Sequence, residues 1–124
     1  MIKLTEIAFS CYPVTDVARA RKFYEGVLGL RPTANFCSPN GMQWTEYDIG
    51  SGTLALGAGV PDWTPQSNGC NVGLEVEDFD AAIEHLRKEK VKFRMEPFPT
   101  PACRMAIISD PDNNTLVIHK RNAT

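Results

Sequence analysis

The chain has 124 residues, 43% of them hydrophobic, which is enough to bury the core of an ordinary globular domain. Thirteen basic and fifteen acidic residues give a formal charge of −2, and no run of Lys or Arg is longer than two. Nucleic acid and anionic membranes are therefore poor candidates for a partner. No apolar run resembles a signal peptide or reaches the roughly 18 residues of a membrane helix, so we expect a cytoplasmic location.

The first half of the chain predicts a strand, a helix and three further strands. Residues 7–12 alternate like a half-buried strand, which Pro13 ends. Asp16 is placed to cap a helix over 17–28, and Gly29 to stop it. Strands are then expected at 31–37, 42–49 and 53–59, which completes a first βαβββ module over about 5–59.

The second half repeats this order after a Pro- and Gly-containing linker at about 60–69. Asp78 is placed to cap a helix that runs to about Lys90, and the prolines in 97–101 favour an extended loop. A second module thus spans about 70–120, within a single domain over 1–124, with strands expected at 70–77, 91–96, 103–109 and 114–120.

Alternation along the strands separates a helix-facing side from an opposite side. In 70–77, Val72, Leu74 and Val76 should face the helix, and Asn71, Gly73 and Glu75 the other way. In 114–120, Leu116 and Ile118 should face the helix, and Thr115, Val117 and His119 the other way. The same argument assigns Ile7 and Phe9 to the helix side of the first strand, with Glu6, Ala8 and Ser10 opposite.

The two halves match each other at a spacing of 62 residues, half the length of 124. The segment from Asp48 to Gly57 overlays the one from Asp110 to His119, and Val14-Thr15-Asp16 overlays Val76-Glu77-Asp78 without a gap. Two copies of one module tend to place a ligand site between them, so equivalent positions can be compared for their chemistry. The four cysteines form no C-x-x-C pair, and we expect them to be mostly small buried residues.

Three segments resemble the vicinal oxygen chelate superfamily, which includes glyoxalase I, the bleomycin-resistance proteins and the extradiol dioxygenases. They are Val14-Thr15-Asp16 with the following Arg21 to Leu30, the run from Val76 to Ala82, and the turn from Asp110 to Asn114. Asn113 replaces the usual glycine of that turn, which Asn tolerates because it enters the φ > 0 region readily. The resemblance implies an α+β fold, with two βαβββ modules in a pseudo-two-fold repeat that form a cup-shaped mixed sheet. It also implies a homodimer.

Metal-using members of this superfamily carry His, Gln or Glu on the first and fourth strands of each module. By the resemblance, these positions correspond to Asn71 and Val117 in the second module and to Ala55 on the fourth strand of the first. The first-strand position of the first module stays open between Glu6, Ala8 and Phe9, and parity favours Glu6 or Ala8. Alanine and valine cannot donate to a metal, so no cofactor is predicted, and a metal, if present, would use Glu6, Asn71 and His119.

Several side chains are candidates for the site. His119 and Glu75 share the face opposite the helix and could act as acid and base. Alternation places Trp44 and Tyr47 on opposite faces of their strand, so at most one of them contacts a ligand. The candidate ligand-binding residues are Asn71, Trp44, Tyr47, Arg104 and Trp63.

Two functions are compatible with these residues. Ala55 and Val117 favour a metal-independent protein that binds a small organic molecule in the cavity between the modules. The alternative is a divalent-metal-dependent lyase, isomerase or dioxygenase with an atypical site. The sequence does not decide between an enzyme and a binding protein, and it does not identify the ligand.

Overall fold

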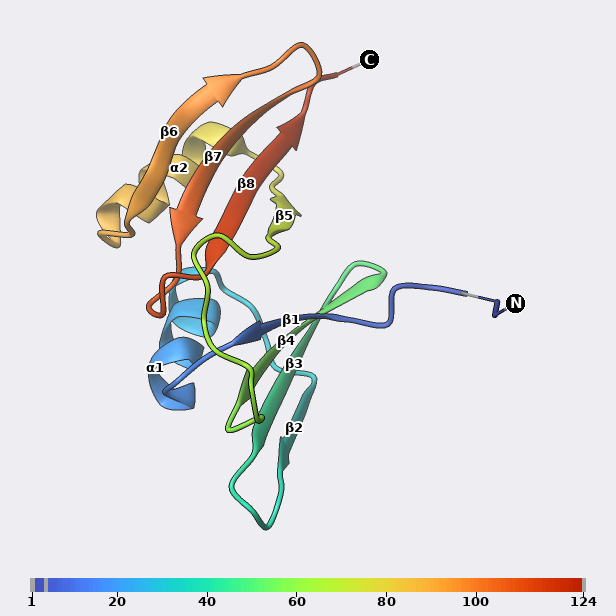
Figure 1. Ribbon diagram of the computed structural model, residues 1–124. Coiled ribbons are helices and arrows are strands. Elements are labelled where there is room, and N and C mark those ends of the chain that lie inside the picture. Colours follow the sequence, from blue (N-terminus) through green and yellow to red (C-terminus); the bar gives the residue numbers. More distant parts are fainter. Residues whose placement is uncertain (1, 4, 124) are drawn as a thin grey trace. The chain divides into compact units, whose positions relative to one another are not determined.

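The computed structural model describes residues 2–3 and 5–123, and the chain divides into two compact units, Met1–Pro65 and Gln66–Thr124. The boundary falls inside the 60–69 segment. Each unit consists of a four-stranded mixed sheet with a helical segment on one face (Figure 1). The predicted α+β class with two βαβββ modules is therefore confirmed.

The sheet of the first unit has the order β1-β4-β3-β2. Its outer pair β1 and β4 is parallel, and the other neighbours are antiparallel. The helical segment begins after Asp16, whose carboxylate accepts a hydrogen bond from the backbone N–H of Arg19 at 3.0 Å. The elements are β1 (Ser10–Pro13), α1 (Val17–Arg21), the π-helix η1 (Lys22–Val27), β2 (Ala34–Cys37), β3 (Gln43–Ile49) and β4 (Gly52–Ala58).

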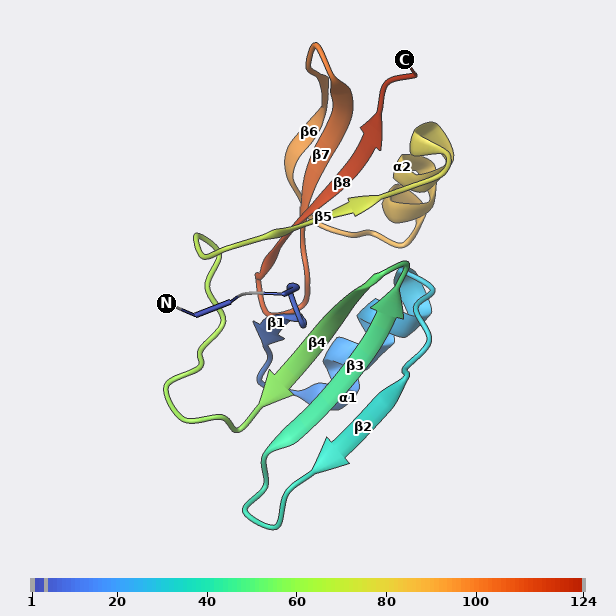
Figure 2. The same cartoon turned by 90° about the vertical axis from the view of Figure 1, so that its right-hand side faces the viewer.

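The sheet of the second unit repeats this topology in the order β5-β8-β7-β6, with β5 parallel to β8 (Figure 2). Asp78 caps the helix as Asp16 does, and accepts from the N–H of Ala81 at 3.0 Å. Asp16 and Asp78 stand 62 residues apart, so the internal repeat includes the hydrogen bond that caps each helix. The elements are β5 (Val72–Glu75), α2 (Phe79–Lys88), β6 (Phe93–Pro99), β7 (Cys103–Ser109) and β8 (Thr115–Arg121).

The helix expected over 17–28 has two parts. After α1 the chain widens into η1, where the N–H of Leu28 reaches the carbonyl of Phe23, five residues back, at 3.0 Å. Gly29 follows with φ of 75°, a conformation that glycine adopts without a steric penalty, and ends the helix as predicted. No helix in the described part of the chain is long and apolar enough to cross a membrane.

The face of each sheet that packs against its helix carries the core. In the first unit Tyr24 of η1 stacks on the fully buried Tyr47 of β3, with ring centroids 6.2 Å apart. The other buried residues of that sheet face include Tyr12, Thr45, Leu54 and Leu56. In the second unit Leu116 and Ile118 are buried with Phe79, Ile83 and Leu86 of α2, as alternation predicts. We call the opposite face of each sheet its open face.

The first strand differs from its prediction. It begins at Ser10, and its pairing with β4 sets Ser10 beside Leu54 and Tyr12 beside Leu56, so these residues share the helix-facing side. Phe9 therefore belongs to the open face, and the expectation that Ile7 and Phe9 face the helix is wrong. Ile7 is 81% exposed and Phe9 44%. Local alternation cannot fix the parity of a strand when only long-range pairing determines where it starts.

The proline-rich segment also differs from its prediction, because β6 runs to Pro99 and includes two of the prolines that favoured a loop. β6 is an edge strand, and its register against β7 shifts twice between Phe93 and Phe98. Edge positions and bulges tolerate a missing N–H donor, which explains why Pro97 and Pro99 remain in the strand.

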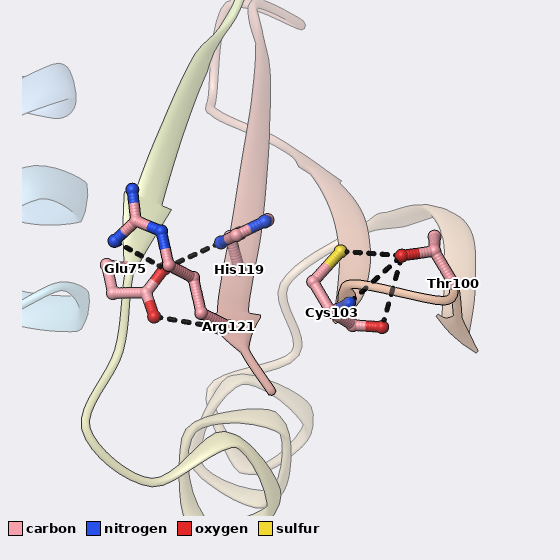
Figure 3. Close-up of polar contacts among 5 residues, drawn as sticks. All are labelled: Glu75, Thr100, Cys103, His119 and Arg121. Atoms are coloured by element: carbon pink, nitrogen blue, oxygen red, sulfur yellow. Dashed lines mark hydrogen bonds and ion pairs between the residues drawn. The ribbon is translucent and has the colours of Figure 1, made fainter. Parts of the chain in front are cut away.

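The cysteines are less buried than expected. Cys37 and Cys70 are exposed, Cys11 is half-buried, and only Cys103 is buried. Cys103 follows the turn after β6, and its thiol lies 3.0 Å from the hydroxyl of Thr100 (Figure 3). Cys37 ends an edge strand and Cys70 precedes β5, so neither position lies inside a sheet where small apolar side chains pack.

Candidate functional site

Three aromatic rings gather on the open face of the first sheet. Trp44 of β3 lies edge-on to Phe9, with ring centroids 5.2 Å apart and an interplanar angle of 89°. Trp63, from the segment after β4, is tilted at 47° to Trp44 with centroids 6.0 Å apart. Trp63 is 43% exposed and Phe9 44%, so both rings offer apolar surface to a ligand. We call Phe9, Trp44 and Trp63 the aromatic cluster.

Small neighbours position Trp44 against the sheet. Gly57 lies directly across from it on β4, and a Cβ at Gly57 would come within 3.3 Å of the indole ring and 3.4 Å of the Cys11 thiol. The indole therefore occupies the space that a side chain on β4 would otherwise fill. Burial raises the pKa of Cys11 to about 12, so its thiol is uncharged beside the ring at neutral pH.

The orientation of Trp44 is also fixed by a carboxylate that was not predicted from the sequence. The indole N–H donates to Oε2 of Glu46 at 2.8 Å. Residues two apart on a strand share a face, so the spacing between Trp44 and Glu46 could have indicated this contact from the sequence.

Tyr47 lies on the opposite side of β3 from Trp44, as alternation predicts, and does not belong to the aromatic cluster. Its hydroxyl donates to Glu25 at 2.9 Å, and Glu25 also accepts from Arg21 at 2.5 Å. The hydrogen bond from Arg21 lowers the pKa of Glu25, while burial and the contact with Glu25 raise the pKa of Tyr47. Tyr47 is thus a core residue that anchors the helical segment.

A histidine and a glutamate meet on the open face of the second sheet (Figure 3). Nδ1 of His119 lies 2.6 Å from Oε1 of Glu75, and the other imidazole nitrogen points away from Glu75. The backbone N–H of Arg121 donates to Oε2 of Glu75 at 2.8 Å and, together with His119, lowers the pKa of this carboxyl group. Alternation and register bring these two predicted residues together from β5 and β8.

The remaining predicted residues of the second unit take different places. Asn71 directly precedes β5 and is exposed, at the start of the open face. Arg104 lies on the helix side of β7, where its guanidinium pairs with Asp80 at 2.7 Å and sits 4.5 Å above the Phe79 ring. Arg104 therefore joins β7 to α2 and is not part of the face that carries His119.

The strand registers show which residues of this chain take the positions that, by the family resemblance, correspond to metal-ligand positions. Ser10 pairs with Leu54 in the first unit, and Val72 pairs with Leu116, each 62 residues later, in the second. The 62-residue repeat thus continues without a gap through both parallel strand pairs. Phe9 is therefore equivalent to Asn71, and Ala55 is equivalent to Val117. Of the first-strand alternatives, Phe9 and not Glu6 or Ala8 takes this position.

These four positions provide almost no side-chain atoms that could coordinate a metal. Phe9, Ala55 and Val117 carry no donor, and the amide of Asn71 is the only donor left, so the set does not fit a divalent cation. Within residues 2–3 and 5–123, no three His, Cys, Asp or Glu side chains gather where they could hold a metal. Of the other two predicted donors, Glu6 lies exposed before β1 in the first unit, and His119 lies in the second unit with Nδ1 against Glu75.

The first unit also has a hollow of about 260 Å³ on the helix side of its sheet. Arg21, at its wall, is paired with Glu25. The hollow is lined by Val17, Arg21, Asn35, Phe36, Cys37, Gln43, Trp44 and Thr45. It is an alternative place for a ligand of the first unit.

Comparison with known proteins identifies one superfamily. Residues 4–118 match the family model described as Glyoxalase/Bleomycin resistance protein/Dioxygenase superfamily. No curated protein matches the sequence significantly.

Solved structures of similar fold cover nearly the whole chain. TnmS3, an antibiotic binding protein from Streptomyces sp. CB03234, has a TM-score of 0.82 at 24% identity and covers 98% of this chain and 100% of its own. A glyoxalase/bleomycin resistance protein from the same organism has a TM-score of 0.74 at 27% identity, covering 91% and 98%. The fosfomycin resistance protein FosX from Mesorhizobium loti has a TM-score of 0.72 at 20% identity, covering 94% and 92%.

Proposed function

We propose, since the chain belongs to the glyoxalase/bleomycin resistance protein/dioxygenase superfamily, that it binds a small organic molecule without a metal. The observation that carries this proposal is the aromatic cluster of Phe9, Trp44 and Trp63 on the open face of the first sheet. By the family resemblance, Phe9 stands at a position that corresponds to a metal ligand in metal-using relatives. An apolar ring there suits an organic ligand, because such sites are lined mainly by apolar and aromatic side chains.

The fold supports organic antibiotics as the first ligand class to screen, since TnmS3 is described as an antibiotic binding protein. Trp44 and Trp63 are the only two tryptophans, so the intrinsic tryptophan fluorescence of the chain reports on the aromatic cluster alone. A ligand that contacts this cluster should change the emission and be recovered chemically unchanged.

Variants of single residues test the location. Trp44→Ala should weaken a ligand found in such a screen at least about tenfold, or about 1.4 kcal/mol, because it removes the central ring of the cluster. Arg104→Gln is the matched control, since Arg104 packs on α2 in the other unit, and it should leave the affinity unchanged. Asn35→Ala tests the hollow beside α1. Because Trp44 also lines that hollow, Trp63→Ala separates the two places, and a ligand that is sensitive to Asn35→Ala and insensitive to Trp63→Ala would contradict the proposal.

Acid–base catalysis is a second candidate function, favoured by the contact between Glu75 and His119. The Glu75 carboxylate can accept a hydrogen bond from Nδ1–H of His119, and in that tautomer Nε2 is the ring nitrogen with a free lone pair for a substrate proton. Turnover of a bound compound that is lost in His119→Gln, and retained in His85→Gln on the solvent side of α2, would establish this function. Turnover that is unchanged in His119→Gln would remove the pair from the mechanism.

We also propose a homodimer, as commonly formed in this superfamily. All four residues of the edge strand β2 are exposed, and an exposed edge offers backbone hydrogen-bonding groups to a second chain. Light scattering gives the test: a mass of 13.7 kDa, that of one chain, would contradict the dimer.

A further inference from the structure

The open face of the first sheet is acidic as well as aromatic. Alternation and register place Glu46 and Asp48 of β3 on the same face as Trp44, and no Lys or Arg lies on this face of β1 to β4. Across the ladder from Glu46 stands Ala55, and across from Asp48 stands Thr53, whose hydroxyl donates to Asp48 at 2.9 Å. The aromatic cluster is therefore accompanied by negative charge that the sheet itself does not neutralise.

Glu46 is the carboxylate next to the rings. One of its oxygens is fixed by the N–H of Trp44, at 2.8 Å, so the group is held at the edge of the indole. Among the described residues, no Lys, Arg or His forms an ion pair with Glu46. Its second oxygen and the remaining negative charge can serve a ligand.

Aromatic rings and a carboxylate attract the same kind of ligand. The face of an aromatic ring attracts a cation through its quadrupole, most strongly in the case of tryptophan, and several rings at different inclinations form the usual receptor for alkylated ammonium groups. The angles of 89° and 47° in the aromatic cluster provide such differently inclined walls. A carboxylate at their edge adds a direct attraction, while an anionic ligand would be repelled.

We propose that the ligand of this face is an organic cation, whose ammonium group contacts the Glu46 carboxylate and whose apolar skeleton packs on Phe9, Trp44 and Trp63. This inference rests on the proposed function, since it names the chemical class of the ligand that binds the aromatic cluster. The site selects by charge through Glu46 and by shape through the rings.

Three naphthyl compounds with the same ring and different charge separate the two contributions. They are naphthylmethyl trimethylammonium as the cation, naphthalenemethanol as the neutral compound and naphthaleneacetate as the anion. Their affinities are measured by calorimetry, with tryptophan quenching as the second readout. The wild type should bind the cation at least about tenfold more tightly than the alcohol, which corresponds to about 1.4 kcal/mol, and the anion least.

Glu46→Gln is the decisive variant, because the amide oxygen can still accept from the Trp44 indole while the charge is lost. It should reduce the affinity for the cation to that for the alcohol and leave the alcohol unchanged. Asp48→Asn, a charge change on the same face with a partner of its own, should have the smaller effect. An unchanged emission spectrum of the unliganded Glu46→Gln variant shows that the cluster is intact.

The outcomes distinguish the inference from the proposed function. Equal affinity of the wild type for cation and alcohol, both lost in Trp44→Ala, would overturn the inference and leave organic-ligand binding standing. Cation selectivity that survives Glu46→Gln would also overturn it. If no naphthyl compound binds in a way that depends on Trp44, the inference fails, and the antibiotic screen decides the proposed function separately.

Discussion

Phe9 and Asn71 hold the same position in the two units, each directly before the parallel strand that pairs with the last strand of its sheet. One is an apolar ring that lies edge-on to Trp44, and the other is an exposed amide. The two units have thus diverged in chemistry at equivalent places. The first unit presents an aromatic and acidic face, whereas the second presents a hydrogen-bonded histidine and glutamate.

The chemistry at these equivalent positions predicts the response to metals. Protein purified without a chelator should contain much less than one divalent cation per chain by elemental analysis, because Phe9, Ala55 and Val117 provide no donor. Its melting temperature should not change with EDTA or with added Zn, Ni or Mn, since a ligand stabilises the fold only when it binds the native state. A tightly bound metal at one per chain would contradict the metal-independent function.

Gly57→Ala should disturb the aromatic cluster and leave the fold intact. The new methyl group would meet the Trp44 ring at 3.3 Å and the Cys11 thiol at 3.4 Å, and both are side chains that can shift by a few tenths of an ångström. We expect a changed tryptophan emission and a loss of stability of about 1 kcal/mol, at the lower end of the cost of overpacking. Gly73→Ala is the matched control, because nothing lies within 4 Å of its Cβ position. Identical emission in Gly57→Ala and wild type would contradict the packing of the Trp44 ring against Gly57.

The two helix caps should contribute similarly to stability. Asp16→Ala and Asp78→Ala each remove the acceptor for a backbone N–H of the first helical turn, and each should lower the free energy of unfolding by about 1 kcal/mol. Chemical denaturation measures both values. Asp78→Asn restores a capping acceptor and should recover most of the loss. A variant Asp78→Ala as stable as the wild type would show that the cap does not stabilise α2.

Asn113 offers a test of the turn between β7 and β8. Its φ is 65°, in the left-handed region that non-glycine residues seldom adopt. Asn113→Gly should therefore keep the melting temperature or raise it, whereas Asn113→Ala should lower the stability by about 1 kcal/mol, because a Cβ without a compensating polar group is strained there. Equal melting temperatures for the two variants would contradict the strain argument.

Local signals predicted much of the fold. Asp16 and Asp78 cap their helices as expected, and β7 has the predicted bounds of 103–109, because capping and short apolar strands depend on nearby residues. The parity of β1 and the course of β6 were predicted wrongly. Both depend on which strand lies alongside, and the sequence of one segment does not contain that information.

The candidate site was predicted in part for the same reason. Alternation correctly predicted that Glu75 and His119 lie on the same face. The parallel register of β5 and β8 then sets the two residues side by side. Trp44 and Tyr47 separate as alternation requires. Glu46 was overlooked although it lies two residues from Trp44, and the interaction of Tyr47 with Glu25 links residues 22 apart, which no local pattern indicates.

The hydrogen bonds of Glu25 predict how stability depends on acid. The pKa of Glu25 in the folded protein is lowered from 4.5, first through the hydrogen bond from Arg21 and further by that from Tyr47. A lowered native pKa means that the ionised carboxylate stabilises the fold above pH 4.5, and that this contribution is lost as the pH falls through the native pKa.

Glu25→Gln can still accept from both partners but does not titrate, so its free energy of unfolding should fall less between neutral pH and pH 3 than that of the wild type. At neutral pH the wild type should be the more stable by less than about 1 kcal/mol, since the pair with Arg21 is partly exposed. Urea denaturation at a series of pH values measures this, with Glu84→Gln on the exposed side of α2 as the control. Parallel pH profiles for wild type and Glu25→Gln would show that Glu25 does not contribute to acid sensitivity.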